Sequence, residues 1–317
     1  MKTIAFIVQQ TMIFSIPLLV VGMGGMYSER SGVINVGLDG GMIMGAFTGT
    51  LFINRMQGVI SGQGLLLLAL LVAGLSGFIF TIFHAFASIN LKANQVISGT
   101  AMNMFAPAFA IFAARLVFGT QQVPFRDTFF IRRIPLLGDI PIIGPLLFQN
   151  AYLTTYIGFL IFFIAWFVIQ RTPFGLRLRA CGEHPGAADT VGIDVQRMRW
   201  AGTLISGFLA GIGGLAFVVP TSTESNATVY GYGFLSLAVM IFGQWRSQKI
   251  LGAAFFFGLM KTIASAYSAI PGIKDLPIPA TVYKMIPYIA TLIVLIFMSK
   301  RSQAPAAEGI PYEKTGR

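Results

Sequence analysis

Hydrophobic residues form long continuous runs along this chain, and short polar segments separate them. Five runs are almost entirely apolar: residues 4–26, 65–87, 96–114, 152–170 and 200–220. A helix that crosses the hydrocarbon core of a bilayer needs about 20 such residues, because backbone N–H and C=O groups cannot stay unpaired there. Each of these runs therefore predicts one membrane-spanning helix.

Four further runs are shorter or carry a polar residue. They are residues 37–53, which contain Asp39, residues 231–244, residues 250–270, which contain Lys261, and residues 285–299. We interpret them as short or broken spans. The whole pattern predicts an all-α, polytopic membrane helix bundle of about 8–10 transmembrane helices. Residues 1–299 then form one transmembrane domain.

Two stretches share an organisation. The first run is followed by a Gly-rich break (residues 23–41) and a short apolar helix, and residues 200–220 are followed by a polar break (residues 221–233) and another short helix. Short, interrupted helices at matching positions of two halves are typical of inverted repeats around a substrate path. We therefore expect inverted-repeat character, with the two breaks on opposite sides of the membrane.

Small residues recur at every fourth position of the fifth run, at Gly202, Ser206, Ala210 and Gly214. Small residues at this spacing let two helix backbones approach closely in lipid. Packing within the chain explains the stripe more simply than a subunit interface does, although both remain open.

Composition agrees with a membrane protein. Apolar types make up 55% of the 317 residues and charged types only 10%, far below the roughly 25% of a soluble domain. The net charge is +11, but the basic residues do not form the basic and aromatic patches that bind nucleic acid. The chain's surroundings are a lipid bilayer, and Cys181, its single cysteine, cannot form an internal disulfide.

Basic residues in short loops set the orientation, because Lys and Arg resist translocation. They collect in the loop 171–199 and in the tail 300–317, which holds Lys300, Arg301, Lys314 and Arg317. Both segments are therefore predicted to be cytoplasmic, including the C-terminus. Alternation then places residues 29–31, 90–95 and 245–249 in the cytosol and the loop 119–151 outside.

Polar side chains next to the apolar runs are candidates for a substrate path: Asn35, Asp39, Asn94, Gln95 and Asn103. A carboxylate inside a membrane segment is costly and by default suggests function. The alternative is that Asp39 caps or pairs at a helix entry near Arg30. The four amides suit an uncharged polar solute, but each could equally satisfy the end of a broken helix.

Catalytic and metal-binding patterns are missing from the sequence. His84 and His184 are too few for a metal cluster, and no nucleotide-cradling G-x-x-x-x-G-K-[ST] loop occurs. We expect no metal, no cofactor and no enzyme activity in this chain; energy from ATP would require another subunit. A secondary transporter that works without an ATPase is the alternative. It would need membrane-buried acidic residues to relay protons or sodium ions, and only Asp39 is a fair candidate, which counts against this alternative.

The loop 171–199 is long, and a structureless loop of this length in a compact bundle is uncommon and usually functional. Pro185, Ala187 and Ala188 permit a short helix over residues 185–190, and Gly192 suits its C-terminal cap. Around this short helix lie arginine-rich flanks. The segment reads either as a solvated linker or as a contact site for another protein, and we favour the contact site.

Four blocks of the sequence are distinctive: ERSGVINVGLDGGMIMGAF, LKANQVISGTAMNMFA, IPLLGDIPIIGPLLF and RTPFGLRLRACGEHPGAADTVGIDVQRMRW. Together they resemble the permease subunits of bacterial ABC importers for branched-chain amino acids, ribose-type sugars and nucleosides. The motifs SGVINVGLDG and NQVISGT are most similar to those of the nucleoside branch of this family. The resemblance implies a type II importer-like fold in the bacterial cytoplasmic (inner) membrane and a nucleoside as solute. A ribose-type sugar or a branched-chain amino acid is the alternative.

The resemblance also implies partners: ABC ATPase subunits that hold ATP and Mg, a second paralogous permease, and an extracytoplasmic substrate-binding lipoprotein. The family's coupling helix, which contacts the ATPase, matches eight residues of this chain: Gly182, Glu183, His184, Pro185, Ala187, Ala188, Gly192 and Ile193. His184 stands where the family more commonly has Asn. This departure puts a side-chain-specific role at residue 184 in doubt, but leaves the helix expected.

Overall fold

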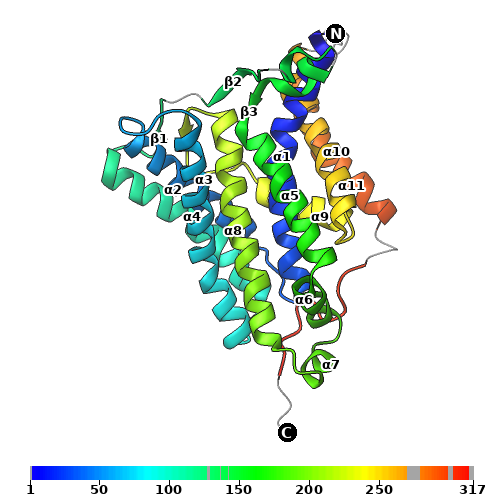
Figure 1. Cartoon of the computed structure of the whole chain (residues 1–317). Coiled ribbons are helices and arrows are strands. Elements are labelled where there is room, and N and C mark those ends of the chain that lie inside the picture. Colours follow the sequence, from blue (N-terminus) through cyan, green and yellow to red (C-terminus); the bar gives the residue numbers. More distant parts are fainter. Residues whose placement is uncertain are drawn as a thin grey trace.

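Helices make up most of the protein (Figure 1). The computed structural model describes residues 2–126, 129–135, 137–141, 143–269, 279–298 and 303–313. Within these ranges the strands form two small antiparallel pairs, β1 (Val123–Pro124) with β4 (Glu224–Ser225) and β2 (Phe130–Arg133) with β3 (Gln149–Tyr152). The predicted all-α membrane bundle is confirmed.

Each of the nine predicted runs coincides with one helix. In chain order these helices are α1 (Lys2–Arg30), α2 (Leu38–Met56), α3 (Gln63–Ala85), α4 (Gln95–Phe118), α5 (Leu153–Arg171), α8 (Val195–Thr221), α9 (Tyr232–Phe242), α10 (Ser247–Ala266) and α11 (Ala280–Met298). Within the described ranges, six of them are long and apolar enough to span a membrane: α1, α3, α4, α5, α8 and α10. The predicted run ends at residues 270 and 299 lie outside the described residues.

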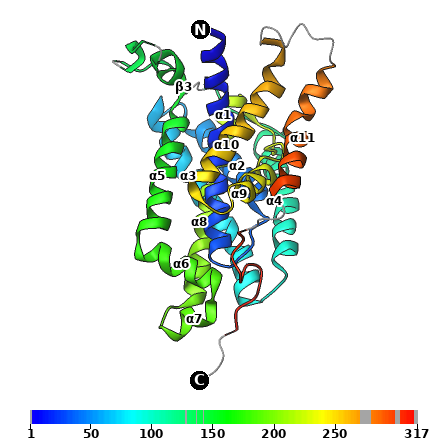
Figure 2. The ribbon, with the colours of Figure 1, turned by 90° about the vertical axis from the view of Figure 1, so that its right-hand side faces the viewer.

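The remaining elements are short. They are the π-helical turns η1 (Phe86–Asn90) and η3 (Gly144–Phe148), the 3-10 turns η2 (Leu137–Asp139) and η4 (Tyr267–Ala269), and the helices α6 (Pro173–Glu183) and α7 (Pro185–Thr190). Helices α6 and α7 lie at one end of the bundle, opposite the end that carries the N-terminus, β2 and β3 (Figures 1 and 2).

Helix α8 is the centre of the bundle, packed against α1, α2 and α3. The small-residue stripe makes these contacts possible. A Cβ atom at Gly202 would lie 2.7 Å from the Tyr27 carbonyl of α1, and Cβ atoms at Gly211 and Gly214 would clash with backbone of α3 and α2. The stripe therefore serves packing within the chain, which confirms the simpler interpretation.

The two halves run in opposite directions. Gly202 faces Tyr27 while Gly213 faces Val21, so α8 is antiparallel to α1. The break after α1, residues 31–37, lies at the α6–α7 end, where the Gly32 carbonyl accepts a hydrogen bond from Gly309. The break after α8 lies at the other end, where β4 pairs with β1. The expected placement of the two breaks is confirmed.

Two local predictions were wrong. The Gly-rich break was expected to start at residue 23, but α1 continues to Arg30. Gly24 and Gly25 lie inside this helix, where Ser206 of α8 and Met240 of α9 pack closely against them. Helix α6 was read as part of a loop. Pro173 ends α5 but also begins α6, with the Thr172 hydroxyl accepting a hydrogen bond from the Gly175 N–H as the cap.

Candidate functional site

The unwound segment between α1 and α2 is held by amide side chains. Asn35 is buried; its Nδ2 donates to the Ser206 hydroxyl at 2.9 Å and its Oδ1 accepts from the Gly37 N–H at 3.1 Å. Gln95 Oε1 accepts from the Ile34 N–H at 2.7 Å. Backbone groups left unpaired by the break are thereby satisfied, as buried polar groups require.

Two other predicted substrate-path residues, Asn103 and Asn94, also hydrogen-bond the backbone at the ends of broken helices. Asn103 bridges the break, with its Oδ1 accepting from the Gly40 N–H at 2.7 Å and its Nδ2 donating to the Val36 carbonyl at 2.9 Å. Asn94 caps α4 by accepting from the Val96 and Ile97 N–H groups. All four amides thus satisfy ends of broken helices in this conformation, while a role toward solute stays a prediction.

Asp39 links the two halves of the bundle. Its carboxylate accepts a hydrogen bond from the Gly233 N–H of α9 at 2.9 Å, so the first turn of α2 meets the first turn of α9. Two helix N-termini therefore face this carboxylate, and both favour its negative charge. The expected helix-entry pairing is present, but its partner is Gly233; Arg30 is engaged elsewhere.

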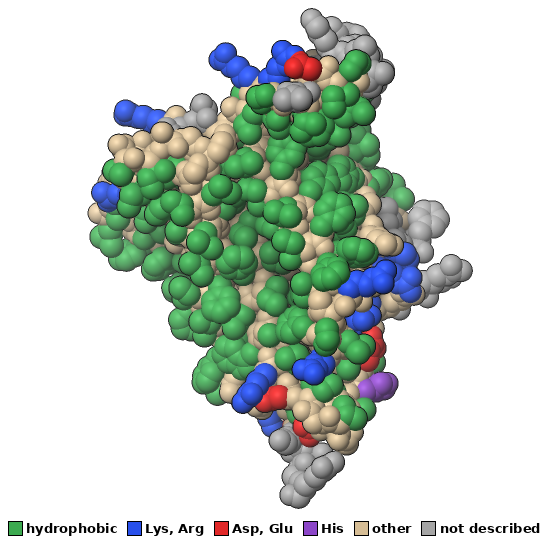
Figure 3. All heavy atoms as spheres, viewed as in Figure 1, with side chains coloured by type: hydrophobic (Ala, Val, Ile, Leu, Met, Phe, Trp, Pro, Cys, Tyr) green, Lys and Arg blue, Asp and Glu red, His purple; other side chains and the backbone are tan. Residues whose placement is uncertain are grey.

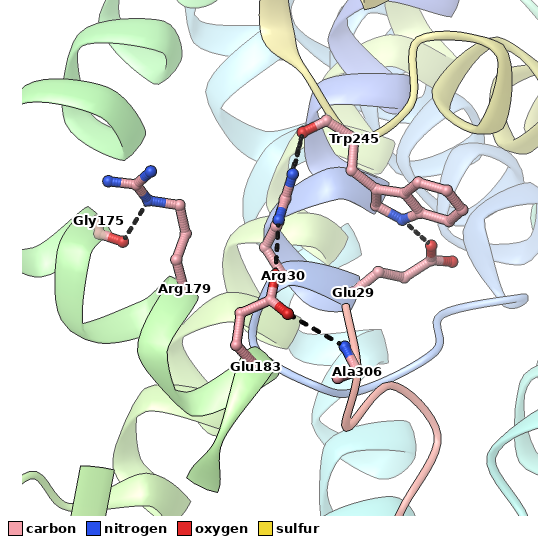
Figure 4. Close-up of polar contacts among 7 residues, drawn as sticks. All are labelled: Glu29, Arg30, Gly175, Arg179, Glu183, Trp245 and Ala306. Atoms are coloured by element: carbon pink, nitrogen blue, oxygen red, sulfur yellow. Dashed lines mark hydrogen bonds and ion pairs between the residues drawn. The ribbon is translucent and has the colours of Figure 1, made fainter. Parts of the chain in front are cut away.

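A cavity of about 390 Å³ and an ion-pair cluster lie at the α6–α7 end (Figure 4). Arg30 Nη1 donates to Glu183 Oε1 at 3.1 Å, and Nη2 and Nε donate to the Trp245 carbonyl at 3.1 and 3.3 Å. The Trp245 indole N–H in turn donates to Glu29 Oε2 at 2.5 Å. One cluster therefore joins the ends of α1 and α6 to the turn before α10.

Helix α7 has the boundaries expected from the sequence. Gly192 follows it with φ of +84°, the left-handed conformation of a C-terminal cap, and its N–H donates to the Asp189 carbonyl. One side faces inward: Ala188 is buried with Cys181 and Val195. The other side is exposed and includes His184, Ala187, Gly192 and the 74% exposed Val191.

The eight predicted coupling residues are therefore brought together but do not share one face. Gly182 and Ala188 are buried, Glu183, Pro185 and Ile193 are half-buried, and His184, Ala187 and Gly192 are exposed. A Cβ atom at Gly182 would clash with the Arg30 carbonyl, which explains the glycine there. Sequence reasoning missed Val191, an exposed apolar side chain in a polar loop, and the roles of Arg30 and Trp245.

Cys181 has no reactive character. It is fully buried, and burial raises the pKa of its thiol to about 11, so the neutral thiol dominates. Within the described residues, no three His, Cys, Asp or Glu side chains are grouped to hold a metal ion.

A second cavity, of about 490 Å³, lies between α9, α10 and α11. Lys261 lines it, with Nζ 5.8 Å from the centroid of the Tyr232 ring. None of the five predicted substrate-path residues lines this cavity. This contact between residues 232 and 261 could not be predicted from the sequence, because the two residues meet only when α9 and α10 pack.

Comparison with known proteins decides the family. The family model for the branched-chain amino acid transport system permease component matches residues 7–296. The guanosine ABC transporter permease protein NupQ of Bacillus subtilis (strain 168) is 41% identical over 100% of this chain and 99% of its own length. The nucleoside ABC transporter permease protein NupC of Lactococcus lactis subsp. cremoris (strain MG1363) is 39% identical over 99% of this chain and 98% of its own length.

The chain belongs to this permease family. A third relative, the guanosine ABC transporter permease protein NupP of the same B. subtilis strain, is 24% identical over 89% of this chain and 78% of its own length. Two different permeases of one organism, both named for guanosine, thus match this permease. Together with its apolar helices, the family establishes a multi-pass membrane protein that serves as the permease component of an ABC transporter.

Proposed function

We propose that this permease forms the transmembrane path of an ATP-driven importer for a nucleoside. Its full-length similarity to NupQ and NupC supports the solute class. Partner ATPase chains hold the ATP and Mg, an extracytoplasmic lipoprotein delivers the solute, and a second, paralogous permease completes the path. The matching pair NupP and NupQ supports the second permease.

The α6–α7 end is the cytoplasmic end in this proposal. The loop 171–199 carries five arginines, and the same end of the bundle holds the turn before α10 and residues 303–313. The N-terminus and the described parts of residues 119–151 then lie outside. Residues Lys300, Arg301, Lys314 and Arg317, which also predict this orientation, lie outside the described residues.

One observation supports the coupling role most directly: Ala187 of α7 and Val191 just after it are exposed at the end of the bundle, while Ala188 on the other side of α7 packs on Cys181 of α6 and Val195 of α8. Val191 and Ala187 point outward, whereas Glu183 is tied to Arg30 at the end of α1. An ATPase that changes shape can bias the permease only through a contact that differs between two states. A surface helix joined to the break between α1 and α2 can supply that contact.

The test is reconstitution of the permease with its ATPase, its second permease and the lipoprotein in vesicles. We expect ATP-dependent uptake of radiolabelled guanosine, and little uptake of ribose or leucine. Preference for ribose or leucine would overturn the solute class, and uptake that persists without ATP would overturn the energy source.

The docking face is tested by Val191→Arg combined with Ala187→Arg. We expect this variant to lose ATPase copurification and uptake while the fold is retained, because both side chains are exposed. Val59→Arg is the matched control, since Val59 is also an exposed valine, 82% accessible, but follows α2 at the opposite end. Equal effects of both changes would contradict the assignment.

A further inference from the structure

The cavity of about 390 Å³ at the α6–α7 end is lined by Arg30, Arg179 and Arg246, by three neutral polar residues of α5 and α10, and by Met26, Ile169 and Trp245. We name it the arginine cavity. It lies between α1, the end of α5, α6 and the start of α10. Figure 4 shows Arg30 extending from α1 and Arg179 extending from α6.

Of the three arginines in this cavity, Arg179 and Arg246 have no carboxylate partner among the described residues. No Asp or Glu is among the described residues that line it. Arg30 is neutralised by Glu183 at 3.1 Å. Arg179 uses only Nε, which donates to the Gly175 carbonyl at 3.3 Å, and the described residues offer no hydrogen bond to its Nη atoms or to the Arg246 guanidinium. The Nη atoms of Arg179 and the guanidinium group of Arg246 are therefore available to donate hydrogen bonds to an anion.

The position of the cavity favours a phosphate carried by a lipid. Helix α5 ends at Arg171 beside the cavity, and its last turns expose Phe163, Ile164 and Phe167. In Figure 3, Lys and Arg side chains gather beside α6, directly below the apolar surface over α5. Acyl chains on that surface would place a headgroup at the level of the arginines, and basic pockets between helices on the cytoplasmic side bind anionic headgroups.

We propose that the arginine cavity binds the phosphodiester headgroup of an anionic phospholipid, with Arg179 and Arg246 donating to its oxygens. Planar guanidinium groups suit a phosphate because they donate two parallel hydrogen bonds. Free phosphate shares this chemistry but has no acyl chains to occupy the apolar surface above.

The full-length permease in detergent is titrated with dioctanoyl phosphatidylglycerol, dioctanoyl phosphatidylcholine and inorganic phosphate, and binding is followed by native mass spectrometry. We expect phosphatidylglycerol to bind, and the double variant Arg179→Gln, Arg246→Gln to bind it about 30-fold more weakly. The control Arg177→Gln, Lys249→Gln removes two exposed charges from the same helices, neither of which lines the cavity.

Three outcomes would overturn the proposal: equal loss in the control, equal binding of phosphatidylcholine, or displacement of the lipid by equimolar inorganic phosphate. The thermal midpoint without lipid shows whether each variant folds. If the Gln variant does not fold, the double variant Arg179→Lys, Arg246→Lys is measured instead. It keeps the positive charges but cannot donate two parallel hydrogen bonds, so its affinity for phosphatidylglycerol is expected to fall severalfold. Unchanged affinity would overturn the proposal.

A second feature stands on separate observations. Residues 303–313, which we name the C-terminal strap, lie against the coupling region. The Ala307 N–H donates to the Gly182 carbonyl at 2.9 Å, and the Ala306 N–H donates to Glu183 Oε2 at 3.3 Å (Figure 4). Tyr312 packs on the cluster formed by Cys181, Ala188 and Val195.

The same strap also contacts the break after α1 and the start of α8. The Gly309 N–H donates to the Gly32 carbonyl at 3.1 Å, and Gly309, with φ of +75°, lies against Ile34. Arg199 Nη1 donates to the Ile310 carbonyl at 2.8 Å. The strap is thus bonded at one side to the predicted coupling residues and at the other to the unwound segment that leads to Asn35 and Asp39.

We infer that the C-terminal strap transmits displacement of α6 and α7 to the break between α1 and α2. This inference rests on the proposed coupling to an ATPase. The strap residues are positioning residues: they hold the coupling helix and the break at a fixed spacing, so that a push on one moves the other.

The test compares a chain that ends at Gln303 with a chain that ends at Glu313, each assembled with its partners. The shorter chain is expected to keep ATPase copurification and ATP hydrolysis but to lose uptake per ATP hydrolysed at least about fivefold. Cys181, the only thiol of the chain, should react faster with maleimide once Tyr312 is absent; Tyr312→Ala in the full chain should expose it in the same way.

Unchanged uptake per ATP in the shorter chain would overturn the inference. Loss of ATPase copurification would do so as well, since the strap would then belong to the docking surface. A full-length chain with no ATP-dependent guanosine uptake would instead refute the proposed function, so the two failures are distinguishable.

Discussion

At the scale of single residues, the polar side chains inside the membrane are engaged with the backbone. Asn35, Gln95 and Asn103 all bond the unwound segment after α1, and Asp39 bonds the first turn of α9. The sequence identified these residues, because polar groups next to apolar runs are costly unless paired. It could not choose their partners, because residues 39 and 233 meet only once the helices are packed.

Substitution of Asp39 separates its structural role from a role toward solute. Asp39→Asn keeps an oxygen that accepts from Gly233, so stability should change little, whereas Asp39→Ala leaves that N–H unpaired and should cost about 1–3 kcal/mol. Thermal unfolding in detergent measures the difference. If Asp39→Asn folds normally but abolishes uptake, the negative charge acts on the solute path.

A methyl group at Gly182 should disturb the joint between α6 and α1. Gly182→Ala places a Cβ against the Arg30 carbonyl, and the backbone shift should cost about 1–3 kcal/mol. Gly186→Ala is the control, because nothing lies within 4 Å of that position. Equal thermal midpoints for the two variants would contradict the close approach.

The Cys181 thiol should respond to pH in a defined direction. Because burial raises its pKa from about 9 to about 11, the folded chain keeps a proton that the unfolded chain releases. The stability from this group is complete below pH 9 and is lost as the pH rises through 11. Maleimide labelling of the folded permease should therefore still accelerate between pH 10 and 11, where a thiol with a pKa of about 9 is already almost fully ionised; a plateau from pH 10 upward would show an ordinary thiol.

At the scale of elements, each of the nine hydrophobic runs predicted a helix that the described residues contain. The reason is that lipid offers no hydrogen-bond partners, so a backbone that spans the membrane must pair its own N–H and C=O groups. Helix ends were harder. The sequence correctly bounded α7, where Pro185 and Gly192 give local signals, but missed α6, whose Pro173 both ends one helix and starts the next. It also began the first break too early, since Gly24 and Gly25 serve helix packing.

Close packing of α8 against α3 should depend on single glycines. A Cβ at Gly211 would meet the Ala73 carbonyl, whereas Gly252 on α10 has nothing within 4 Å. Gly211→Ala should therefore lower the thermal midpoint, at a cost of about 1–3 kcal/mol, while Gly252→Ala should leave it unchanged or slightly raised. Similar stability of the two variants would argue against α8 as the tightly packed centre.

At the scale of the whole molecule, two antiparallel halves place one break at each end. The first lies beside α6, α7 and the C-terminal strap, and the second lies beside β1 and β4. In the proposed function, the end that carries α6 and α7 is the end that contacts the ATPase. The proposed orientation puts this end in the cytosol.

Thiol labelling in whole cells tests that orientation. In a Cys181→Ser background, Gln121→Cys after α4 should react with a membrane-impermeant maleimide added outside, and Lys249→Cys at the start of α10 should react only after permeabilisation. Both residues are exposed. The reverse pattern would invert the topology and remove α7 from the ATPase.

The sequence by itself determined that this chain is a helical membrane bundle, where its helices run, and which loop forms a short surface helix. These properties follow from local chemistry: the length of the apolar runs, and proline and glycine at helix ends. Only the tertiary structure decided which residues meet, namely Asp39 with Gly233, Arg30 with Glu183, and the C-terminal strap with Gly32 and Gly182. Contacts between residues so far apart in the chain depend on how the helices pack. The apolar pattern predicts which segments form helices, but it does not predict which helices become neighbours.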